Sequence, residues 1–542
     1  MKKLLLLGDE ALAQGAIDAG MSGVFAYPGT PSTEITEYIQ MNEDAIKRNI
    51  HRTWASNEKT ALEAAVGMSY TGKRTMSCMK HVGLNVAADP FMNSAFVGAN
   101  GGHLVAVADD PSMHSSQNEQ DSRTYAKFAM IPCLEPSSQQ EAYDMAFYGL
   151  DYSEKTKLPI MVRLTTRLSH SRAGVNRKEM LPENELRLPE DPDQFMLLPA
   201  FSRRKYKKLL AKQEQLITAS EESPFNSYEE GTDKSLGIIA CGLAYNYVKE
   251  VFEDGKSPYP ILKVCQYPLP RKMIHKIMQD CDKILVVEEG QPVVEEMLKG
   301  YMPNDKITGR MDGTFTYDGE MNPNKVMAAL GMEDCSGAMV PEDVAGRPPA
   351  LCLGCPHSDS FKALNAVLEE YGNGHVFSDI GCYTLGYLPP YNAINTVLDM
   401  GASITMAKGA ADGGLFPAIA VIGDGTFGHS GMTGLADCIY DKTNVVIMIL
   451  DNLTTGMTGG QDYSIETKLE DVCIGLGVKK EHIRVVTPLK RLHEENMKVL
   501  REEIAYDGVS VVIPRRECIQ TFGKTSLVKQ SLEAAKKVSD KK

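Results

Sequence analysis

The chain has 542 residues, a length that exceeds what one hydrophobic core can organise and that predicts about three domains. Its composition, 43% hydrophobic and 24% charged residues, is typical of a folded globular protein. A net charge of −14 repels phosphate backbones and anionic lipids, so we expect neither nucleic acid nor a membrane as a partner.

The N-terminus has two lysines followed by a run of leucines from Leu4 to Leu7. This run is too short for the apolar region of a signal peptide, so we predict a short buried strand there. The sequence has no stretch of about 18 apolar residues, which predicts no membrane span. The 12 cysteines, in a chain without an expected signal peptide, indicate free thiols in a reducing compartment. We therefore expect a cytoplasmic protein.

Alternating apolar runs and helical patterns define the expected domains. In residues 1–180 this alternation predicts a parallel sheet wrapped by helices. Residues 181–233 are rich in Pro, Glu, Lys and Arg and are expected to form a connecting segment with an exposed amphipathic helix. The alternation returns in a small middle domain, 234–335, and in a third domain, 345–535. The predicted fold class is therefore α/β, with three doubly wound domains.

The third domain contains an apolar strand that ends in Gly423, Asp424 and Gly425 and leads into a helical pattern. A second apolar strand ends at Asn452. Because parallel strands finish at the same edge of a sheet, we expect Asp424 and Asn452 to converge there. A carboxylate, an amide and a diphosphate together supply oxygen ligands that suit Mg²⁺. Backbone N–H groups of the glycine turn can hold the other phosphate oxygens.

Two other interpretations of this segment stay open at this point. Gly-Asp-Gly is also an ordinary turn. The letters GDGTFG match the dinucleotide fingerprint G-x-G-x-x-G as well, with Asp451 at a strand end where it could accept a ribose hydroxyl. In that interpretation Asp424 would face the pyrophosphate with like charge, a conflict that a Mg²⁺ ion between them removes.

Four cysteines have a spacing that is compatible with a metal or iron–sulfur site. Cys352 and Cys355 form a C-x-x-C pair, while Cys382 and Cys518 each follow an apolar strand. All four can therefore reach one sheet edge. From the residues alone, a redox dithiol, a zinc half-site, a cluster and chance pairing all remain open.

Three further residues are candidates, each with an ordinary structural alternative. Glu58 lies at the expected start of a helix, where a glutamate commonly serves as a helix-start charge. Thr30 lies in the loop YPGTPS, where a hydroxyl commonly stabilises a turn. His357, close to Cys355, is as compatible with a hydrogen-bonded structural role as with assistance near a diphosphate.

Taken together, these segments resemble the 2-oxoacid:ferredoxin oxidoreductases over essentially the whole chain. GDG followed by DNLTTGMTGGQ is similar to their diphosphate-binding domain, and YPGTPSTE, NEKTALEAAVG and MKHVGLN are similar to their pyrimidine-binding domain. LCLGCPHS, DIGCYTLG and QNEQDSR look most like the large (alpha) subunit of the indolepyruvate-oxidising members. The resemblance implies that 1–180 and 345–535 are thiamine-diphosphate-binding folds and that 234–335 is similar to the C-terminal domain of transketolase.

The resemblance also implies roles for single residues. Mg²⁺ is expected on the side chains of Asp424 and Asn452 and on the backbone carbonyl of Thr454. Glu58 becomes the acid beside the aminopyrimidine ring, and Thr30 lies near the substrate carbonyl. The implied cofactor-binding set is Gly423, Asp424, Gly425, Asn452, Thr454, Gly459 and Gln461. The implied ligands of one proximal [4Fe–4S] cluster are Cys352, Cys355, Cys382 and Cys518.

The implied reaction is the oxidative decarboxylation of an aryl-2-oxo acid with coenzyme A, which gives an aryl-acyl-CoA, carbon dioxide and reduced ferredoxin. In the family the alpha chain pairs with itself and with a smaller beta subunit, so we expect a homodimer of alpha chains within a heterotetramer. The alternatives are a non-oxidative thiamine-dependent decarboxylase whose cysteines are structural and a thiamine-binding subunit without turnover.

Two features depart from the family pattern. Many relatives end in a ferredoxin-like domain with repeated cysteine motifs, whereas only Cys518 lies beyond Cys473 here, so we expect that domain to be absent. Pyruvate-using relatives carry an arginine near the VAVADD segment and an asparagine at the Met457 position. Here Asp109 and Asp110 cannot bind a carboxylate, and the apolar, adaptable Met457 favours a bulky aromatic substrate.

Overall fold

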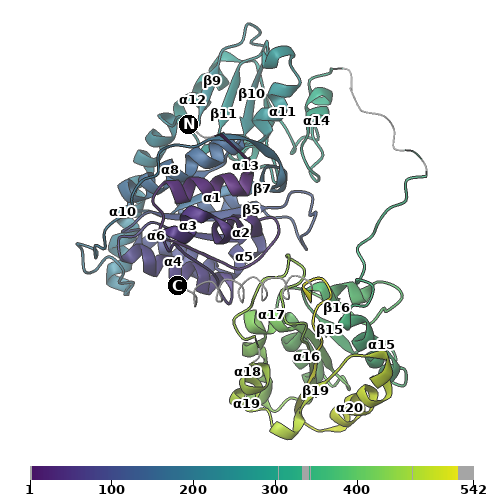
Figure 1. Ribbon diagram of the computed structural model, residues 1–542. Coiled ribbons are helices and arrows are strands. Elements are labelled where there is room, and N and C mark those ends of the chain that lie inside the picture. Colours follow the sequence, from purple (N-terminus) through teal and green to yellow (C-terminus); the bar gives the residue numbers. More distant parts are fainter. Residues whose placement is uncertain (1–2, 303, 333–340, 342, 467, 523–542) are drawn as a thin grey trace, which may run out of the picture. The chain divides into compact units, whose positions relative to one another are not determined.

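The structure is a computed structural model of the chain (Figure 1). It describes residues 3–302, 304–332, 341, 343–466 and 468–522. The chain divides into two compact units, Met1–Met339 and Val340–Lys542, each with its own sheets. Positions 335 and 535, where the second and third predicted domains end, lie outside the described residues.

The first unit is built on a sheet with the strand order β12-β6-β7-β5-β4-β2-β3. Its strands are β2 (Gly23–Ala26), β3 (His51–Trp54), β4 (Thr75–Lys80), β5 (His103–Asp109), β6 (Cys133–Leu134), β7 (Ile160–Thr165) and β12 (Gln266–Tyr267). Neighbouring strands run parallel, apart from the antiparallel β12. The strands β4, β5 and β7 are buried throughout, as in parallel sheets that are covered on both faces.

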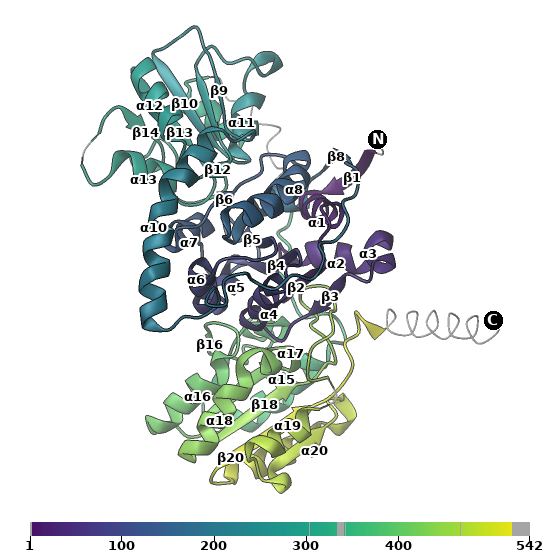
Figure 2. The same ribbon diagram turned by 90° about the vertical axis from the view of Figure 1, so that its left-hand side faces the viewer.

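Helices cover both faces of this sheet, which confirms the predicted α/β class. Figure 2 shows α1 and α8 on one side of the strands and α4, α5 and α6 on the other. The helices are α1 (Gly8–Asp18), α2 (Thr33–Met41), α3 (Glu43–Lys47), α4 (Glu58–Tyr70), α5 (His81–Val86), α6 (Ala88–Val97), α7 (Ser122–Ala129), α8 (Gln139–Thr156) and α9 (Thr166–His170). The loop before α2 and the starts of α4 and α5 each follow a strand, so they lie at one edge of the sheet.

The N-terminal leucine run forms β1, Lys3–Leu7, but the prediction of a buried strand was wrong. β1 pairs antiparallel with β8, Arg172–Asn176, in a sheet separate from the main one. Leu5 is 67% exposed. The physical reason is that this ribbon lies outside the main sheet, so alternate side chains face solvent.

The segment after β8 contains the exposed helix that the sequence predicts. Helix α10, Pro199–Glu221, buries Leu209 and Leu216 while most of its other side chains are exposed or half-buried. A second sheet follows, with the strand order β14-β13-β10-β11-β9. Its elements are β9 (Ser227–Glu229), β10 (Leu236–Cys241), α11 (Ala244–Glu250), β11 (Ile261–Val264), α12 (Arg271–Asp280), β13 (Lys283–Val287), α13 (Val293–Lys299), β14 (Ile307–Thr308) and α14 (Pro323–Ala329).

A buried cation links the main sheet to this middle segment. Arg163, in β7, is fully buried and forms ion pairs with Asp109, Asp121 and Glu135. It also donates a hydrogen bond of 3.2 Å to the carbonyl of Glu289, two residues after β13. Charges can be buried here because each one has a partner of opposite sign. Arg163 is therefore fully engaged by the protein itself.

The second unit contains a parallel sheet with the strand order β16-β15-β17-β18-β20-β19. Its elements are α15 (Pro356–Leu368), β15 (Val376–Ser378), β16 (Thr396–Val397), α16 (Ala402–Asp412), β17 (Ile419–Gly423), α17 (Asp424–Thr426), a π-helical turn (Phe427–Gly431), α18 (Met432–Asp441), β18 (Val445–Leu450), α19 (Leu469–Leu476), β19 (Ile483–Val486), α20 (His493–Ala505) and β20 (Val509–Pro514).

Strand β18 is apolar because both of its faces are buried. Val446 and Met448 belong to a core that also contains residues of α15 and α20. Ile447 and Ile449 belong to a second core, formed with residues of α16 and α18. The alternation follows the two-residue period of a strand. None of the helices in the described ranges combines the length and the apolar character needed to cross a membrane.

Candidate functional site

The two segments that the sequence singles out lie at the same edge of the second unit's sheet. Gly423, the last residue of β17, pairs with Leu450, the last residue of β18. Asp424 therefore begins its helix at the level where Asp451 and Asn452 leave β18. The helical segment after Asp424 includes a π-helical turn, a feature frequent at functional sites.

Asp424 is buried, and one of its carboxylate oxygens is orphaned. The residue is 3% exposed, and Oδ2 has no hydrogen-bond partner among the described residues. Oδ1 accepts a hydrogen bond of 2.7 Å from the N–H of Gly425. Burial raises the pKa of Asp424 well above its usual range, and the negative charge of Asp451 raises it further. A divalent cation at this oxygen would relieve both effects, so the residues fit Mg²⁺.

The loop after β18 folds back on itself and buries two more predicted ligands. Asn452 is 6% exposed and Thr454 is 5% exposed. The loop closes at the carbonyl of Gln461, which accepts from the N–H of Thr455 (2.9 Å) and from Oγ1 of Thr454 (3.3 Å). Gly459 has a φ of +126°, a conformation that favours glycine. Gly459 and Gln461 therefore shape the loop that holds Asn452 and Thr454 in place.

His357 contacts this loop as a neutral side chain. Burial lowers the pKa of His357 to about 4, with the positive charge of Arg516 as a second cause. Nε2 of His357 lies 3.5 Å from Nδ2 of Asn452, the outer limit of a hydrogen bond. A neutral ring can accept from this amide, which fixes the orientation of the Asn452 carboxamide. The contact fits the structural alternative for His357.

The structure adds neighbours that the sequence interpretation did not single out. Tyr383 packs on Gly423, where an added Cβ would lie 2.6 Å from Cε1 of the tyrosine. The Tyr383 hydroxyl donates to Asp379, whose pKa burial raises to about 7. Asp379 directly follows β15, so its position after a strand was the available signal. Asp451 pairs with Arg515, which leaves it poorly placed for the ribose contact of the dinucleotide interpretation.

Two of the four predicted cysteines, Cys382 and Cys518, lie close to this loop. A Cβ added to Gly456 would lie 3.4 Å from Sγ of Cys382 and 3.8 Å from Sγ of Cys518. The N–H of Cys518 donates to the carbonyl of Asn452 (3.0 Å). Burial raises the pKa of Cys382 to about 12, and the other three predicted cysteines contribute to that rise. Among the described side chains of His, Cys, Asp and Glu, no group of three or more is arranged to hold a metal ion.

In the first unit, Glu58 begins α4 directly after its capping residue, Asn57. Glu58 is 5% exposed, and a Cβ added to Gly83 would lie 2.4 Å from its Oε1. Residue 83 must therefore lack a side chain for the carboxylate to lie where it does. Glu63, on the same helix, is half-exposed and pairs with a lysine. The two glutamates of α4 therefore differ in burial: Glu58 is buried, whereas Glu63 is half-exposed.

Thr30 lies in the half-buried loop between β2 and α2. The turn in this loop is held by other hydroxyls: Oγ of Ser32 donates to the carbonyl of Gly29 (2.7 Å), and Oγ1 of Thr33 accepts from the N–H of Gly29 (3.0 Å). The hydroxyls of Ser32 and Thr33 therefore stabilise this turn. Like Glu58, it lies at the carboxyl edge of the first unit's sheet.

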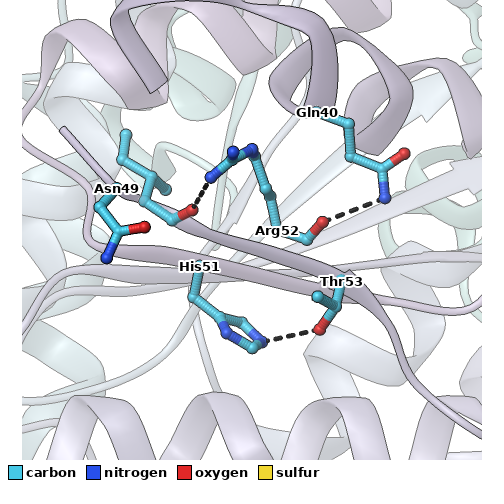
Figure 3. Close-up of a pocket in the computed structure, with 6 residues that line it drawn as sticks. Gln40, Asn49, His51, Arg52 and Thr53 are labelled. Carbon is cyan, nitrogen blue, oxygen red and sulfur yellow. Dashed lines mark hydrogen bonds between the residues drawn. The ribbon is translucent and has the colours of Figure 1, made fainter. Parts of the chain in front are cut away.

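A cavity of about 440 Å³ elsewhere in the first unit lies along the edge strand β3 (Figure 3). Its polar groups largely bond one another: Gln40 donates to the carbonyl of Arg52 (3.0 Å), and Thr53 lies 3.0 Å from a ring nitrogen of His51. Its lining contains none of the predicted site residues. This cavity is therefore separate from the predicted site.

Two family models match the chain. Residues 14–196 match the model described as pyruvate flavodoxin/ferredoxin oxidoreductase, thiamine diphosphate-binding. Residues 379–513 match the thiamine pyrophosphate enzyme C-terminal TPP-binding domain. The first match spans Thr30 and Glu58, and the second spans Asp424 and Asn452. The two halves of the predicted site therefore fall in regions that match thiamine-diphosphate-binding models.

Relatives match over nearly the full chain. The chain is 42% identical to the indolepyruvate oxidoreductase subunit IorA of Archaeoglobus fulgidus, over 95% of this chain and 86% of that protein. It is 39% identical to the subunit of the same name from Pyrococcus horikoshii, with the same coverage. Among solved structures, the 2-oxoglutarate:ferredoxin oxidoreductase of Magnetococcus marinus matches with a TM-score of 0.50 and 17% identity, over 61% of this chain and 65% of that chain. That last match supports the fold alone.

The charge at Asp424 leads to a test by substitution. We expect Asp424→Asn to unfold at a higher temperature than the wild type at pH 8 when no ligand is present. The reason is that the raised pKa of the buried carboxyl lowers wild-type stability as pH rises above the value of an unfolded aspartate. The advantage of the variant should shrink as the pH falls toward 4. The difference in unfolding temperature between the variant and the wild type is measured by thermal unfolding monitored by circular dichroism.

In the same experiment, Mg²⁺ with thiamine diphosphate should raise the unfolding temperature of the wild type and leave that of Asp424→Asn unchanged. Asp437→Asn is the matched control, since Asp437 is an exposed residue of α18 in the same unit. An equal ligand-induced shift in the wild type and in Asp424→Asn would contradict the metal role of Asp424.

Proposed function

Because this chain belongs to the family of indolepyruvate oxidoreductase IorA subunits, we propose that it is the thiamine-diphosphate-binding subunit of a 2-oxoacid:ferredoxin oxidoreductase. The proposed reaction is the decarboxylation of an aryl-2-oxo acid with coenzyme A. It yields an aryl-acyl-CoA, carbon dioxide and a proton, and it passes two electrons to two ferredoxin molecules. The observation that carries the proposal is the orphaned oxygen of the buried Asp424 at the strand ends of the second unit.

The proposal assigns the diphosphate half of the cofactor to residues 345–535 and the pyrimidine half to residues 1–180. In the first of these, Asp424, the side chain of Asn452 and the carbonyl of Thr454 would hold Mg²⁺ and through it the diphosphate. The backbone around Gly423 and Gly425 would contact the phosphate oxygens. Bound thiamine diphosphate supplies a carbon nucleophile and an electron sink for the decarboxylation.

Glu58 is the proposed acid beside the aminopyrimidine ring. Its carboxylate is held in a buried position because Gly83 leaves room for it. A carboxyl group at a fixed point can exchange a proton with the pyrimidine ring, which the activation of the cofactor requires. Thr30, at the same sheet edge, is proposed to orient the carbonyl of the substrate. These roles rest on the family resemblance together with the burial and contacts of the two residues.

Four cysteines are proposed to carry the proximal [4Fe–4S] cluster, and ferredoxin is proposed as the electron acceptor. The closeness of Cys382 and Cys518 to the loop of Asn452 supports this assignment. The raised pKa of Cys382 in a group of neighbouring thiols marks a place where bound iron would stabilise thiolates. The proposal also includes a smaller beta subunit as partner, and a homodimer of this chain within a heterotetramer. The proposed location is the cytoplasm.

The function is tested by anaerobic reduction of a viologen dye in the presence of coenzyme A, with the beta subunit added. We expect indolepyruvate and phenylpyruvate to reduce the dye at least about tenfold more efficiently, in kcat/KM, than pyruvate. The apolar Met457 in place of a polar side chain is the reason. Carbon dioxide release without dye reduction would instead indicate a non-oxidative decarboxylase. Thiamine diphosphate binding without turnover of any 2-oxo acid would reject the catalytic role.

Glu58→Gln should lower kcat by at least about 100-fold, because the amide cannot transfer a proton to the pyrimidine. Binding of thiamine diphosphate, measured by calorimetry, should change little, since the metal ligands lie in the other unit. Glu63→Gln is the matched control on the same helix, and it should keep wild-type kcat. Wild-type turnover in Glu58→Gln would eliminate this role.

Cys382→Ser should abolish the broad visible absorption of an iron–sulfur cluster and most of the iron after anaerobic purification. The wild type is expected to hold about four iron atoms for each chain. Cys438→Ser, which alters a buried cysteine of α18 in the same unit, should keep the wild-type iron content. Full iron content in Cys382→Ser, or none in the wild type, would refute the cluster.

A further inference from the structure

Lys80 is a buried cation at the carboxyl edge of the first unit's sheet. It is the last residue of β4, directly before α5, and it is 7% exposed. Its side chain packs against Gly29, where an added Cβ would lie 3.1 Å from Cβ of Lys80. Its ammonium group donates to the carbonyl of Ser115 (2.6 Å), and Oγ of Ser115 lies 3.3 Å from the carbonyl of Thr30. Lys80 therefore lies next to the Thr30 loop.

The helix that follows Lys80 contains the glycine on which Glu58 rests. Gly83, on which the Glu58 carboxylate rests, comes three residues after Lys80, within one turn of α5. Strands β2, β4 and β5 are neighbours in the sheet, so the segments that follow them share one edge (Figure 2). Lys80 therefore ends its strand at the sheet edge that carries the residues proposed to act on the cofactor and the substrate.

The charge of Lys80 is not paired by direct contact with a carboxylate in the described part of the chain. Its ammonium donates to the carbonyl and to the hydroxyl of Ser115, which are neutral. The negative charge of Asp110 acts on Lys80 without such a contact. Asp110 accepts instead from the N–H of Ser115 (2.8 Å), from Ser116 (2.6 Å) and from Thr166 (2.6 Å).

Burial lowers the pKa of Lys80 to about 8. The negative charge of Asp110 raises this pKa, but it offsets only part of the decrease. A buried ammonium without a contacting anion is costly to keep. Lys80 differs in this respect from the other buried cation of the sheet, Arg163, which has three carboxylate partners. The site around Lys80 is therefore suited to accept an anion from outside the protein.

Resting on the proposed function, we propose that Lys80 binds the carboxylate of the 2-oxo acid substrate. Arg163 is already paired with three carboxylates, so its charge is not available for this role. Lys80 lies beside the loop of Thr30, the residue proposed to orient the substrate carbonyl. A 2-oxo acid presents its carboxylate and its carbonyl on adjacent carbons, which two neighbouring polar groups can hold together.

The test compares Lys80→Met with the wild type in the complex with the beta subunit. We expect the KM for phenylpyruvate to rise at least about tenfold, the size expected from losing a charge-assisted hydrogen bond. The KM for coenzyme A and the affinity for thiamine diphosphate should stay within about twofold. Lys80→Arg, which keeps the charge, should recover part of the loss.

Lys212→Met is the matched control. Lys212 is a half-buried lysine of α10 that also donates to a backbone carbonyl, that of Thr156, and its pKa is also lowered by burial. Thermal unfolding of both variants reports whether either one is destabilised. If Lys80 had a structural role alone, its replacement would lower the unfolding temperature without changing the KM for the 2-oxo acid selectively.

A binding measurement without turnover gives an independent readout. The complex should bind 3-phenylpropionate more tightly than 3-phenylpropionamide, by calorimetry, and Lys80→Met should remove that preference. A preference that survives in Lys80→Met would overturn the proposal, as would an increase in KM for coenzyme A in place of the 2-oxo acid. Absence of any 2-oxo acid turnover in the wild type would overturn the proposed function itself, which is a distinguishable result.

Discussion

Parallel strands deliver their carboxyl ends to one edge of a sheet, and that constraint organises both units of the chain. In the second unit it places Gly423 next to Leu450, so Asp424 and Asn452 meet without long connections. In the first unit, β3, β2 and β4 are adjacent, so Glu58 and Lys80 rise from the same edge. The chemistry proposed for each unit is built on side chains that the topology has already brought together.

The charges around a buried group distinguish those that are paired within the protein from those proposed to bind a ligand. Arg163 and Asp451 are buried or nearly buried, and each has a partner of opposite charge within the protein. Asp424 has an orphaned oxygen beside a like charge, and Lys80 contacts neutral acceptors. Because unpaired charge is expensive at low dielectric, such positions persist where a bound partner offsets the cost. A cation suits the first position and an anion suits the second.

Much of this arrangement could be predicted from the sequence, because apolar runs mark buried strands and the residues that follow them mark the sheet edge. That reasoning reached Asp424 and Asn452, and the resemblance added Glu58. It missed the pairing of Asp451 with Arg515, because that contact depends on which strands are neighbours. It placed the N-terminal leucines in a buried strand, because composition does not reveal that β1 pairs outside the main sheet. Lys80 passed unnoticed because a lysine at a strand end is ordinarily exposed.

The two units also divide the chemical requirements of the proposed reaction. The second unit contributes the proposed oxygen ligands of a metal and a group of thiols. These are proposed to hold the cofactor's diphosphate and to accept electrons, whichever 2-oxo acid is bound. The first unit offers the carboxyl group of Glu58, the hydroxyl of Thr30 and the ammonium of Lys80, which are proposed to act on the cofactor and on the reacting end of the substrate. Lys80 would recognise the carboxylate that every 2-oxo acid carries, so it would secure binding of the class without selecting among its members. The proposed selectivity for an aryl group would then depend on apolar residues such as Met457, since only the side chain distinguishes one 2-oxo acid from another.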